Sequence, residues 1–313
     1  MLWFNKYKNN YILKESLLKI KTWIAASRLP AQIFMFPAVL FGQALHFTQT
    51  GEFSLNTFTW LVVYGIAMHF FIVYINDVAD YETDQKNTTF TPFSGGSRVL
   101  VDGKLSKQSL LIAGLVMAGV VLFAGNLLAI GANDWTLMVW VVGGLFLMHA
   151  YSFSPIKLSY RGFGEVLQML GVGLVLPVVG YLAQGGTYDV LPWLWIVALF
   201  PAQYAMAIST SLPDEPSDKE SQKRTTVVIL GVFKSQRVML MLFAIAIAGI
   251  TILSTTDSAF IFLILGLVIL FTQIFIFYKK KPKPGDFSMF IFVSLAILLN
   301  TVLVLGWSLT LLL

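Results

Sequence analysis

Long apolar segments alternate with short polar segments along nearly the whole chain. Crossing the hydrocarbon core of a bilayer takes about 20 predominantly apolar residues in a helix. Nine segments come close to or exceed this length: 30–48, 57–78, 108–131, 134–152, 162–184, 190–212, 238–254, 258–278 and 288–312. The segment 238–254 is the weakest of them, because it is short and the turn that follows it is brief. The pattern predicts an all-α polytopic membrane protein with nine transmembrane helices.

Composition supports this class of protein. Hydrophobic residues make up 57% of the chain and charged residues 12%, whereas soluble domains carry about 25% charged residues. No long linker divides residues 1–313, so we expect a single transmembrane domain preceded by a polar, lysine-rich segment, 1–29, that lacks the features of a signal peptide. The absence of cysteine from the sequence excludes disulfides and Cys-based metal sites.

The basic residues are confined to alternate connections between the predicted spans. All 21 Lys and Arg fall in 1–29, 79–107, 153–161, 213–237 and 279–287. The charged residues in the other connections are Glu52, Asp134, Asp189 and Asp257. Basic loops stay in the cytoplasm, so we predict a multi-pass protein of the cell inner membrane with a cytoplasmic N-terminus and an outer C-terminus. The net charge of +5 then reflects topology and membrane lipid, with no nucleic-acid partner.

Two clusters of acidic residues follow even-numbered spans on this predicted cytoplasmic side. Asp77, Asp80 and Asp84 are spaced i, i+3, i+7, which places them along one face of a helix. Asp214 and Asp218 repeat the spacing of the second pair. Loop acids are usually solvated, but equal spacing at matching places in the topology favours a shared site. We therefore expect the two clusters to face each other across one cavity, near the cytoplasm.

Carboxylates this close repel each other unless a cation neutralises them. Mg²⁺ usually takes one or two protein carboxylates and keeps positions for water and phosphate oxygens. The clusters therefore predict a metal–phosphate site, in which two divalent ions such as Mg²⁺ could surround one diphosphate. Nearby bases could bind the remaining phosphate oxygens; the candidates are Arg98, Lys219, Lys223 and Arg224.

These motifs resemble the UbiA superfamily of intramembrane prenyltransferases. The family pattern NDxxDxxxD is matched by Asn76, Asp77, Asp80 and Asp84, and its second pattern, DxxxD, by Asp214 and Asp218. The stretch YSFSPIKLSYRGFGE at 151–165 is similar to a segment of the 1,4-dihydroxy-2-naphthoate prenyltransferases of menaquinone biosynthesis, and KRTTVVILG to the one after the second motif. SRLPAQIFMFPAVLFGQAL resembles the opening helix, including Arg28 and Pro30.

The second motif departs from the family pattern. Thr210, Ser211 and Pro213 stand where relatives carry Asn and Arg, and Gln222 stands in place of a Gly. Pro216, inside the motif, predicts a local bend in the backbone.

The resemblance implies nine helices around a central cavity and an isoprenyl diphosphate donor bound through Mg²⁺. By the same resemblance Asp77, Asp80 and Asp84 hold one ion and Asp214 and Asp218 the other, and the catalytic residues are Asp80, Asp84, Asp214 and Asp218. Asn76 orients the diphosphate, and Tyr151, Lys157 and Arg161 lie on a loop that closes over it. The implied reaction is ionisation of the donor, release of diphosphate, and electrophilic attack on an aromatic acceptor of the naphthoate or quinone-precursor type.

Two other functions compete with this one. A UbiA-type terpene cyclase needs the same metal site, with the cation attacking a double bond of its own chain, and this alternative stays open. An ion-coupled transporter would place charges near the bilayer midplane, whereas the strong charges here lie at the edges of the spans.

Glu165, at the start of a span, is read as a helix-terminal charge or an acceptor-side group. His46, His69 and His149 share no metal-ligand spacing and are interpreted as packing or interfacial residues, although His69 lies only one or two helix turns before the acidic motif.

Overall fold

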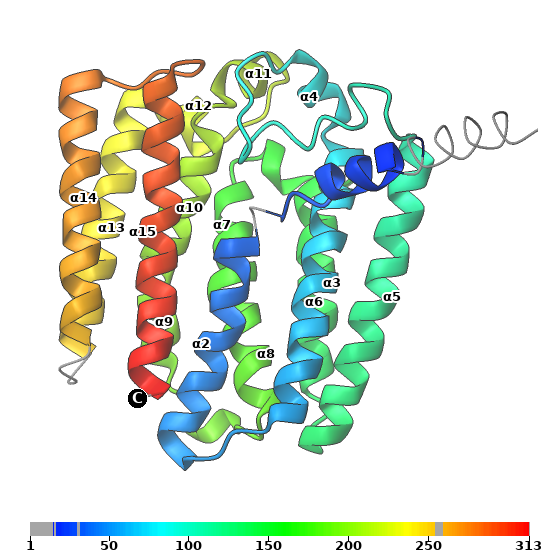
Figure 1. Cartoon of the computed structure of the whole chain (residues 1–313), viewed down its shortest axis with the longest axis vertical. Coiled ribbons are helices and arrows are strands. Elements are labelled where there is room, and N and C mark those ends of the chain that lie inside the picture. Colours follow the sequence, from blue (N-terminus) through cyan, green and yellow to red (C-terminus); the bar gives the residue numbers. More distant parts are fainter. Residues whose placement is uncertain (1–14, 16, 30–31, 254–258, 313) are drawn as a thin grey trace, which may run out of the picture.

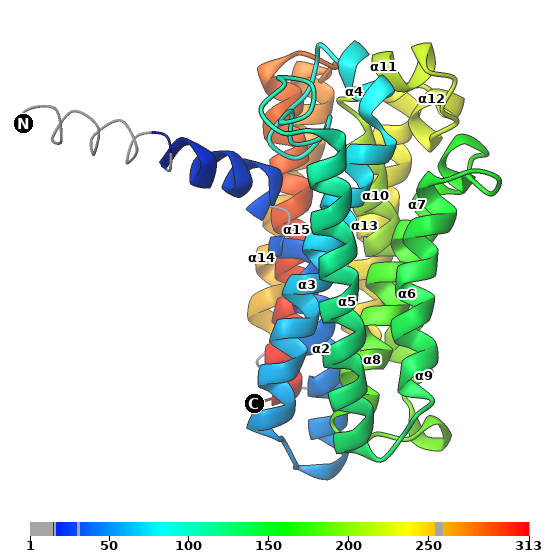
Figure 2. The same cartoon turned by 90° about the vertical axis from the view of Figure 1, so that its right-hand side faces the viewer.

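The protein is a bundle of long helices that run roughly side by side (Figures 1 and 2). The computed structural model describes residues 15, 17–29, 32–253 and 259–312, so Pro30 and Asp257 lie outside the described residues. Within these ranges no strand forms apart from one isolated bridge between Thr91 and Ser94. The all-α prediction is therefore confirmed for this part of the chain.

Seven helical segments in the described ranges are long and apolar enough to cross a membrane. They are α3 (Leu55–Ala79), α5 (Lys107–Ala132), α7 to α8 (Gly164–Ala183), α9 to α10 (Trp193–Ser211), α13 (Val232–Leu253), α14 (Ala259–Lys280) and α15 (Phe287–Leu312). The other two predicted spans correspond to α2 (Gln32–Thr50) and the shorter apolar helix α6 (Leu137–Ser152). The count of nine membrane crossings stays a prediction.

Local chemistry explains where several of these helices begin, end or change. Ser54 caps α3 by accepting a 3.2 Å hydrogen bond from the backbone N–H of Thr57. The predicted span 162–184 divides into α7 (Gly164–Leu170), a π-helical turn η3 (Gly171–Val175) and α8 (Leu176–Ala183). Pro177 has no backbone N–H and cannot bond to the carbonyl of Gly173, four residues earlier. The backbone N–H of Leu176 bonds to the carbonyl of Gly171, five residues earlier, which makes the turn π-helical.

The polar connections contain short helices that the apolar pattern did not predict. They are α4 (Tyr81–Lys86), α11 (Glu215–Glu220) and α12 (Thr226–Leu230), which lie together at one end of the bundle (Figure 1, top). Pro216 stands in the first turn of α11, where its missing N–H costs no helical hydrogen bond. The predicted span 238–254 was too short, because α13 begins at Val232 and includes Lys234 and Arg237.

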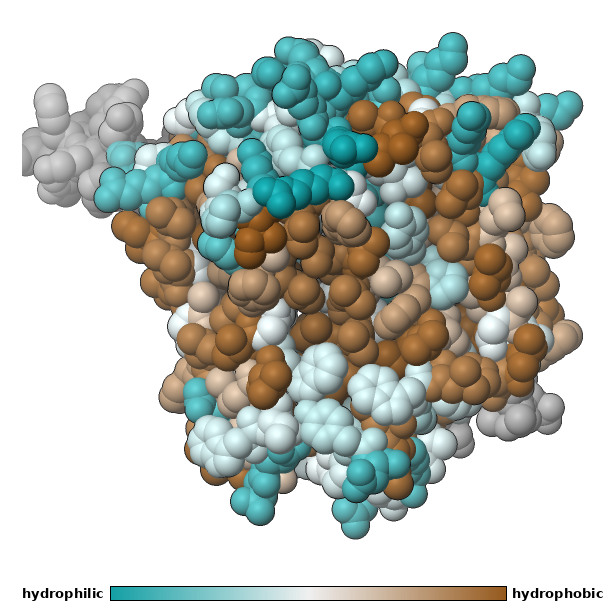
Figure 3. Space-filling view, turned by 180° about the vertical axis from the view of Figure 1, so that it is seen from behind, coloured by the Kyte–Doolittle hydropathy of each residue, from teal (hydrophilic) through white to brown (hydrophobic). Residues whose placement is uncertain are grey.

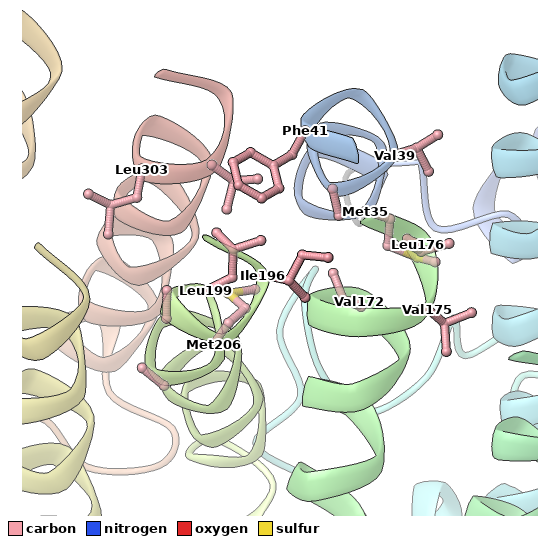
Figure 4. Packing of buried hydrophobic residues seen from close by; sticks show 14 of the residues in the cluster. Met35, Val39, Phe41, Val172, Val175, Leu176, Ile196, Leu199, Met206 and Leu303 are labelled. Atoms are coloured by element: carbon pink, nitrogen blue, oxygen red, sulfur yellow. The ribbon is translucent and has the colours of Figure 1, made fainter. Parts of the chain in front are cut away.

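The interior and the lateral surface are both apolar. In the core, Phe41 of α2 and Leu303 of α15 lie near Leu199, at the junction of α9 (Trp193–Ala198) and α10 (Phe200–Ser211) (Figure 4). A broad hydrophobic surface separates two hydrophilic ends (Figure 3), as expected for a protein whose solvent is lipid. The helical residues 17–26 and the end of α15 lie toward opposite ends of the bundle (Figures 1 and 2). Which end faces the cytoplasm stays a prediction.

Candidate active site

The two acidic clusters meet at one end of a shared cavity. Helix α4 continues from α3 and α11 follows α10, and these two short helices lie side by side (Figure 1). The polar end of the cavity between them is lined by Arg28, Asn76, Asp80, Asp84, Asn87, Asp214, Asp218 and Lys223. The other end is lined by Met35, Met68, Ile72, Leu147, Met148, Val172, Val175 and Leu176. One cavity thus joins a charged mouth to an apolar interior.

Lys223 connects the two clusters. Its Nζ lies 3.0 Å from Oδ2 of Asp80 and 4.0 Å from Oδ1 of Asp218. Burial works against its charge, but the carboxylates outweigh burial and raise the pKa of Lys223 well above its ordinary value. The lysine is therefore charged, and it is the base, among those predicted from the sequence, that reaches both acidic motifs.

Replacing Lys223 by Gln is expected to destabilise the metal-free protein. The change leaves the buried Asp80 and Asp218 without their cation, and breaking a buried ion pair costs about 3–5 kcal/mol. Thermal unfolding with and without Mg²⁺ measures this, and we expect added Mg²⁺ to restore part of the loss. The matched control is Lys219→Gln, an exposed lysine of the same segment. An equal loss of stability in the control would contradict the bridging role.

The acids at the cavity exceed the positive charge beside them. Burial, together with repulsion from Asp80, Asp77 and Asp214, raises the pKa of Asp84 to about 8. Burial raises the pKa of Asp218 to about 7, although Lys223 acts in the opposite direction. Oδ1 of Asp80 is buried and has no hydrogen-bond partner among the described residues. A partnerless carboxylate oxygen, among acids that outnumber the basic side chains beside them and whose charged forms burial and mutual repulsion disfavour, fits a divalent cation with oxygen ligands.

The protein side chains do not enclose such an ion by themselves. Among the described residues, no three His, Asp or Glu side chains are arranged to hold a metal. A cation at this site would therefore complete its shell with water or phosphate oxygens, which is usual for Mg²⁺.

A loop that sequence reasoning missed fixes the second cluster. The amide of Asn87 donates to Oδ1 of Asp214 at 2.7 Å, and the backbone N–H of Gly95 donates to Oδ2 of the same residue at 3.0 Å. Gly95 and Gly96 have φ of +74° and +70°, a conformation that favours glycine. The adjacent glycines in the polar stretch FSGGSR were the available signal for this turn.

Asp77 does not line the cavity, although the sequence placed it on one helix face with Asp80 and Asp84. Helix α3 ends at Ala79, and the bend at Asp80 separates the two sides of the motif. Asp77 accepts 3.2 Å bonds from the backbone N–H of Ser97 and lies 3.8 Å from a guanidinium nitrogen of Arg28. The bend interrupts the predicted continuous helix face, and the role of Asp77 as a metal ligand stays a prediction. Arg28 does line the cavity, and it was absent from the predicted site.

Five of the six basic residues predicted for the site lie away from the cavity lining. The guanidinium of Arg98 donates to the backbone carbonyl of Asp84 and stacks on Phe90. Lys157 lies 3.7 Å from the centre of the Tyr160 ring. The others are Arg161, which donates to the carbonyl of Pro155 at 2.7 Å, and the exposed Lys219 and Arg224. Of the remaining predictions, Tyr151, Asn76 and Lys223 line the cavity.

The structure shows the contacts of Glu165 and His69, the two residues whose roles the sequence left open. Oε1 of Glu165 accepts a 2.6 Å hydrogen bond from the backbone N–H of Thr226 and thereby caps α12, which favours its structural interpretation. His69 lines the cavity, and its Nε2 lies 2.8 Å from the carbonyl oxygen of Ser27. It thus contacts the segment that carries Arg28.

Several curated relatives are similar in sequence to part of this chain. A phytyltransferase for 2-carboxy-1,4-naphthoquinone from Synechocystis is 26% identical over 54% of this chain and 53% of its own length. A lycopene elongase/hydratase from Corynebacterium glutamicum is 26% identical over 64% of this chain and 66% of its own. A 1,4-dihydroxy-2-naphthoate octaprenyltransferase from Bacillus subtilis is 21% identical over 60% and 57%. The chain therefore spans about half to two thirds of the length of these relatives.

Solved structures share the fold over more of the chain. A UbiA homologue from Archaeoglobus fulgidus bound to GPP and Mg²⁺ has a TM-score of 0.65 at 15% identity, covering 91% of this chain and 99% of that one. The apo structure of a UbiA homologue from Aeropyrum pernix K1 has a TM-score of 0.68 at 15% identity, covering 87% and 96%. The sequence model of the UbiA prenyltransferase family matches residues 35–309. This match takes in both acidic motifs and almost every helix described above, and the chain belongs to the UbiA prenyltransferase family.

Proposed function

We propose that the protein transfers an isoprenyl group from an isoprenyl diphosphate to an aromatic acceptor of the naphthoate or quinone-precursor type, with Mg²⁺ as cofactor. The observation that carries the proposal is the cavity that joins a charged mouth to an apolar interior. The A. fulgidus homologue was solved with GPP and Mg²⁺, and two of the relatives named above act on naphthoquinone precursors by name.

The residues at the mouth of the cavity would bind the diphosphate in two ways, through Mg²⁺ ions and through direct hydrogen bonds. Asp80 and Asp84 would hold one Mg²⁺, and Asp214 and Asp218 the other. Bound Mg²⁺ supplies Lewis-acid neutralisation of the charge on the leaving group. Lys223, Arg28 and Asn76 would donate to phosphate oxygens in a fixed geometry that costs no reorganisation. Asp77, through its contacts with Arg28 and Ser97, would position Arg28 and the loop at Ser97 rather than bind Mg²⁺ itself.

The apolar interior would protect the reactive carbon. The C–O bond of the donor breaks and its electron pair leaves with the diphosphate, which creates an allylic cation. A carbon of the acceptor ring forms the new C–C bond, and a proton, or CO₂ from a carboxylated ring, leaves. Side chains such as Met68 and Val172 would surround the isoprenoid tail and exclude water from the cation. In the proposed topology this chemistry takes place at the cytoplasmic face of the membrane.

One incubation tests the proposal against cyclisation. Purified protein receives Mg²⁺ and geranyl, farnesyl or geranylgeranyl diphosphate, with and without 1,4-dihydroxy-2-naphthoate, and the released diphosphate and organic products are measured. We expect a prenylated product of the acceptor, with or without its carboxyl group, only when acceptor and Mg²⁺ are both present. A hydrocarbon or terpene alcohol formed without acceptor would favour the cyclase. Failure to release diphosphate from any donor would contradict both enzymatic functions.

A further inference from the structure

The apolar end of the cavity has a defined floor. Along α3 the last lining residue is Met68, twelve residues below Asp80, a depth of about 18 Å at 1.5 Å per residue. On α6 the lining ends at Gly144, and on α8 it ends at Leu176. Within the described chain, the floor is therefore formed where these three helices stop lining the cavity.

Gly144 is packed against the other residues of this floor. A Cβ atom at Gly144 would lie 3.1 Å from Cε of Met68 and 3.3 Å from Cγ1 of Val175. It would also lie 3.9 Å from the hydroxyl of Tyr64, a fully buried side chain that does not line the cavity. Val175 and Leu176 are consecutive residues of one helical segment (Figure 4), and both line the cavity. A larger side chain at Gly144 would have to displace Met68 or extend into the cavity, and either movement raises the floor.

We propose that Gly144 and Met68 together set the length of isoprenoid tail that the protein accepts. This inference rests on the proposed function, since it assumes an isoprenyl diphosphate whose phosphates lie at Asp80 and whose tail runs down α3 toward Met68. Interiors at this packing density do not absorb extra methylene groups without strain. A side chain at Gly144 would therefore push Met68 into the space that the distal isoprene units of a longer donor need and that a short donor does not.

The neighbouring glycine provides a matched control. Gly143 is half-buried, it does not line the cavity, and a Cβ there would meet no atom within 4 Å. Gly144→Val and Gly143→Val therefore add the same atoms to the same helix, one at the cavity lining and one in open space away from it. The measurement is kcat/KM for geranyl, farnesyl and geranylgeranyl diphosphate under otherwise identical conditions.

We expect Gly144→Val to lower the kcat/KM of geranylgeranyl relative to geranyl diphosphate by about 10–200-fold, the discrimination that a methylene-sized change in an apolar pocket supplies. Gly143→Val should leave the ratio unchanged. Met68→Ala removes the facing side chain and should shift the ratio toward the longer donor. If Gly144→Val fails to fold, as judged by thermal unfolding, Gly144→Ala replaces it, with Gly143→Ala as its control.

The possible outcomes distinguish a failure of the tail-length inference from a failure of the proposed function. An unchanged length profile in the Gly144 variants would mean that the tail leaves the cavity by another route, and would overturn the inference. An equal loss of kcat/KM with all three donors would mean that Gly144 matters only for packing, and would also overturn the inference. Release of diphosphate from none of the donors by the unaltered protein would instead contradict the proposed function.

Discussion

Replacing Asp80 by Asn is expected to lower Mg²⁺-dependent diphosphate release by about 10²–10³-fold, the usual cost of losing one preorganised electrostatic group. The Asp80 carboxylate accepts hydrogen bonds from Asn76 at 2.9 Å and Lys223 at 3.0 Å through Oδ2, and its Oδ1 remains without a partner in the described chain. The substitution keeps the shape and removes the charge. Asp218→Asn should have a comparable effect, because Asp218 is the nearest acid of the second cluster to Lys223.

A second measurement separates loss of metal binding from loss of folding. Mg²⁺ with inorganic diphosphate should raise the thermal unfolding temperature of the unaltered protein by mass action, and this increase should be reduced or absent in Asp80→Asn. The control is Glu82→Gln, because Glu82 is an exposed acid on the adjacent helix α4 that does not line the cavity. Asp80→Asn and Asp218→Asn proteins that both kept full turnover and the full Mg²⁺ shift would refute the metal site.

Replacing Gly96 by Ala should damage both stability and activity. A Cβ at this position would collide with Oδ2 of Asp84 and lie 3.3 Å from Oδ1 of Asp77, and the residue has φ of +70°. The new methyl group must push the Asp84 carboxylate out of its place in the cavity. We expect a loss of about 1–3 kcal/mol in stability from strain and displacement, together with a fall of at least about tenfold in diphosphate release.

The same loop system contains the control that isolates the cause. Gly103 has φ of +66°, but a Cβ there would meet no atom within 4 Å. Gly103→Ala therefore carries the backbone cost of a left-handed alanine, about 1 kcal/mol, without the collision. Thermal unfolding and diphosphate release for the two variants give the comparison. Equal losses in both would show that the contact with Asp84 does not matter and that backbone conformation alone is responsible.

Sequence reasoning succeeded where structure depends on local composition. A helix in lipid must satisfy its own backbone hydrogen bonds and present an apolar surface, so the positions of the long helices followed from runs of apolar residues. Most predicted boundaries agree with the structure within a few residues, as for 57–78 against Leu55–Ala79. The clearest miss, 238–254, arose because Lys234 and Arg237 were assigned to a loop. Long basic side chains can extend from a helix terminus to the interface while the backbone remains helical.

The acidic clusters were also visible in the sequence, because their spacing is repeated at matching places in the topology. Their detailed geometry was not. Whether Asp77 faces the cavity depends on the bend at Asp80 and on contacts with Ser97 and Arg28, which lie 20 and 49 positions away in the numbering. Among seven basic or polar candidates for phosphate binding beside Tyr151, spacing could not distinguish Lys223, buried between two carboxylates, from the exposed Lys219 four residues earlier.

By itself, the sequence determined the class of protein, the helical segments, the asymmetry of charge and the pair of acidic motifs, because each of these is a property of neighbouring residues. Only the tertiary structure decided which carboxylates share the cavity, that Asn87 and the Gly95–Gly96 turn hold Asp214 and border Asp84, and that Gly144 lies at its floor. Each of these depends on contacts between helices far apart in the chain. Such contacts are set by how the helices pack and where each one bends, which no local pattern records.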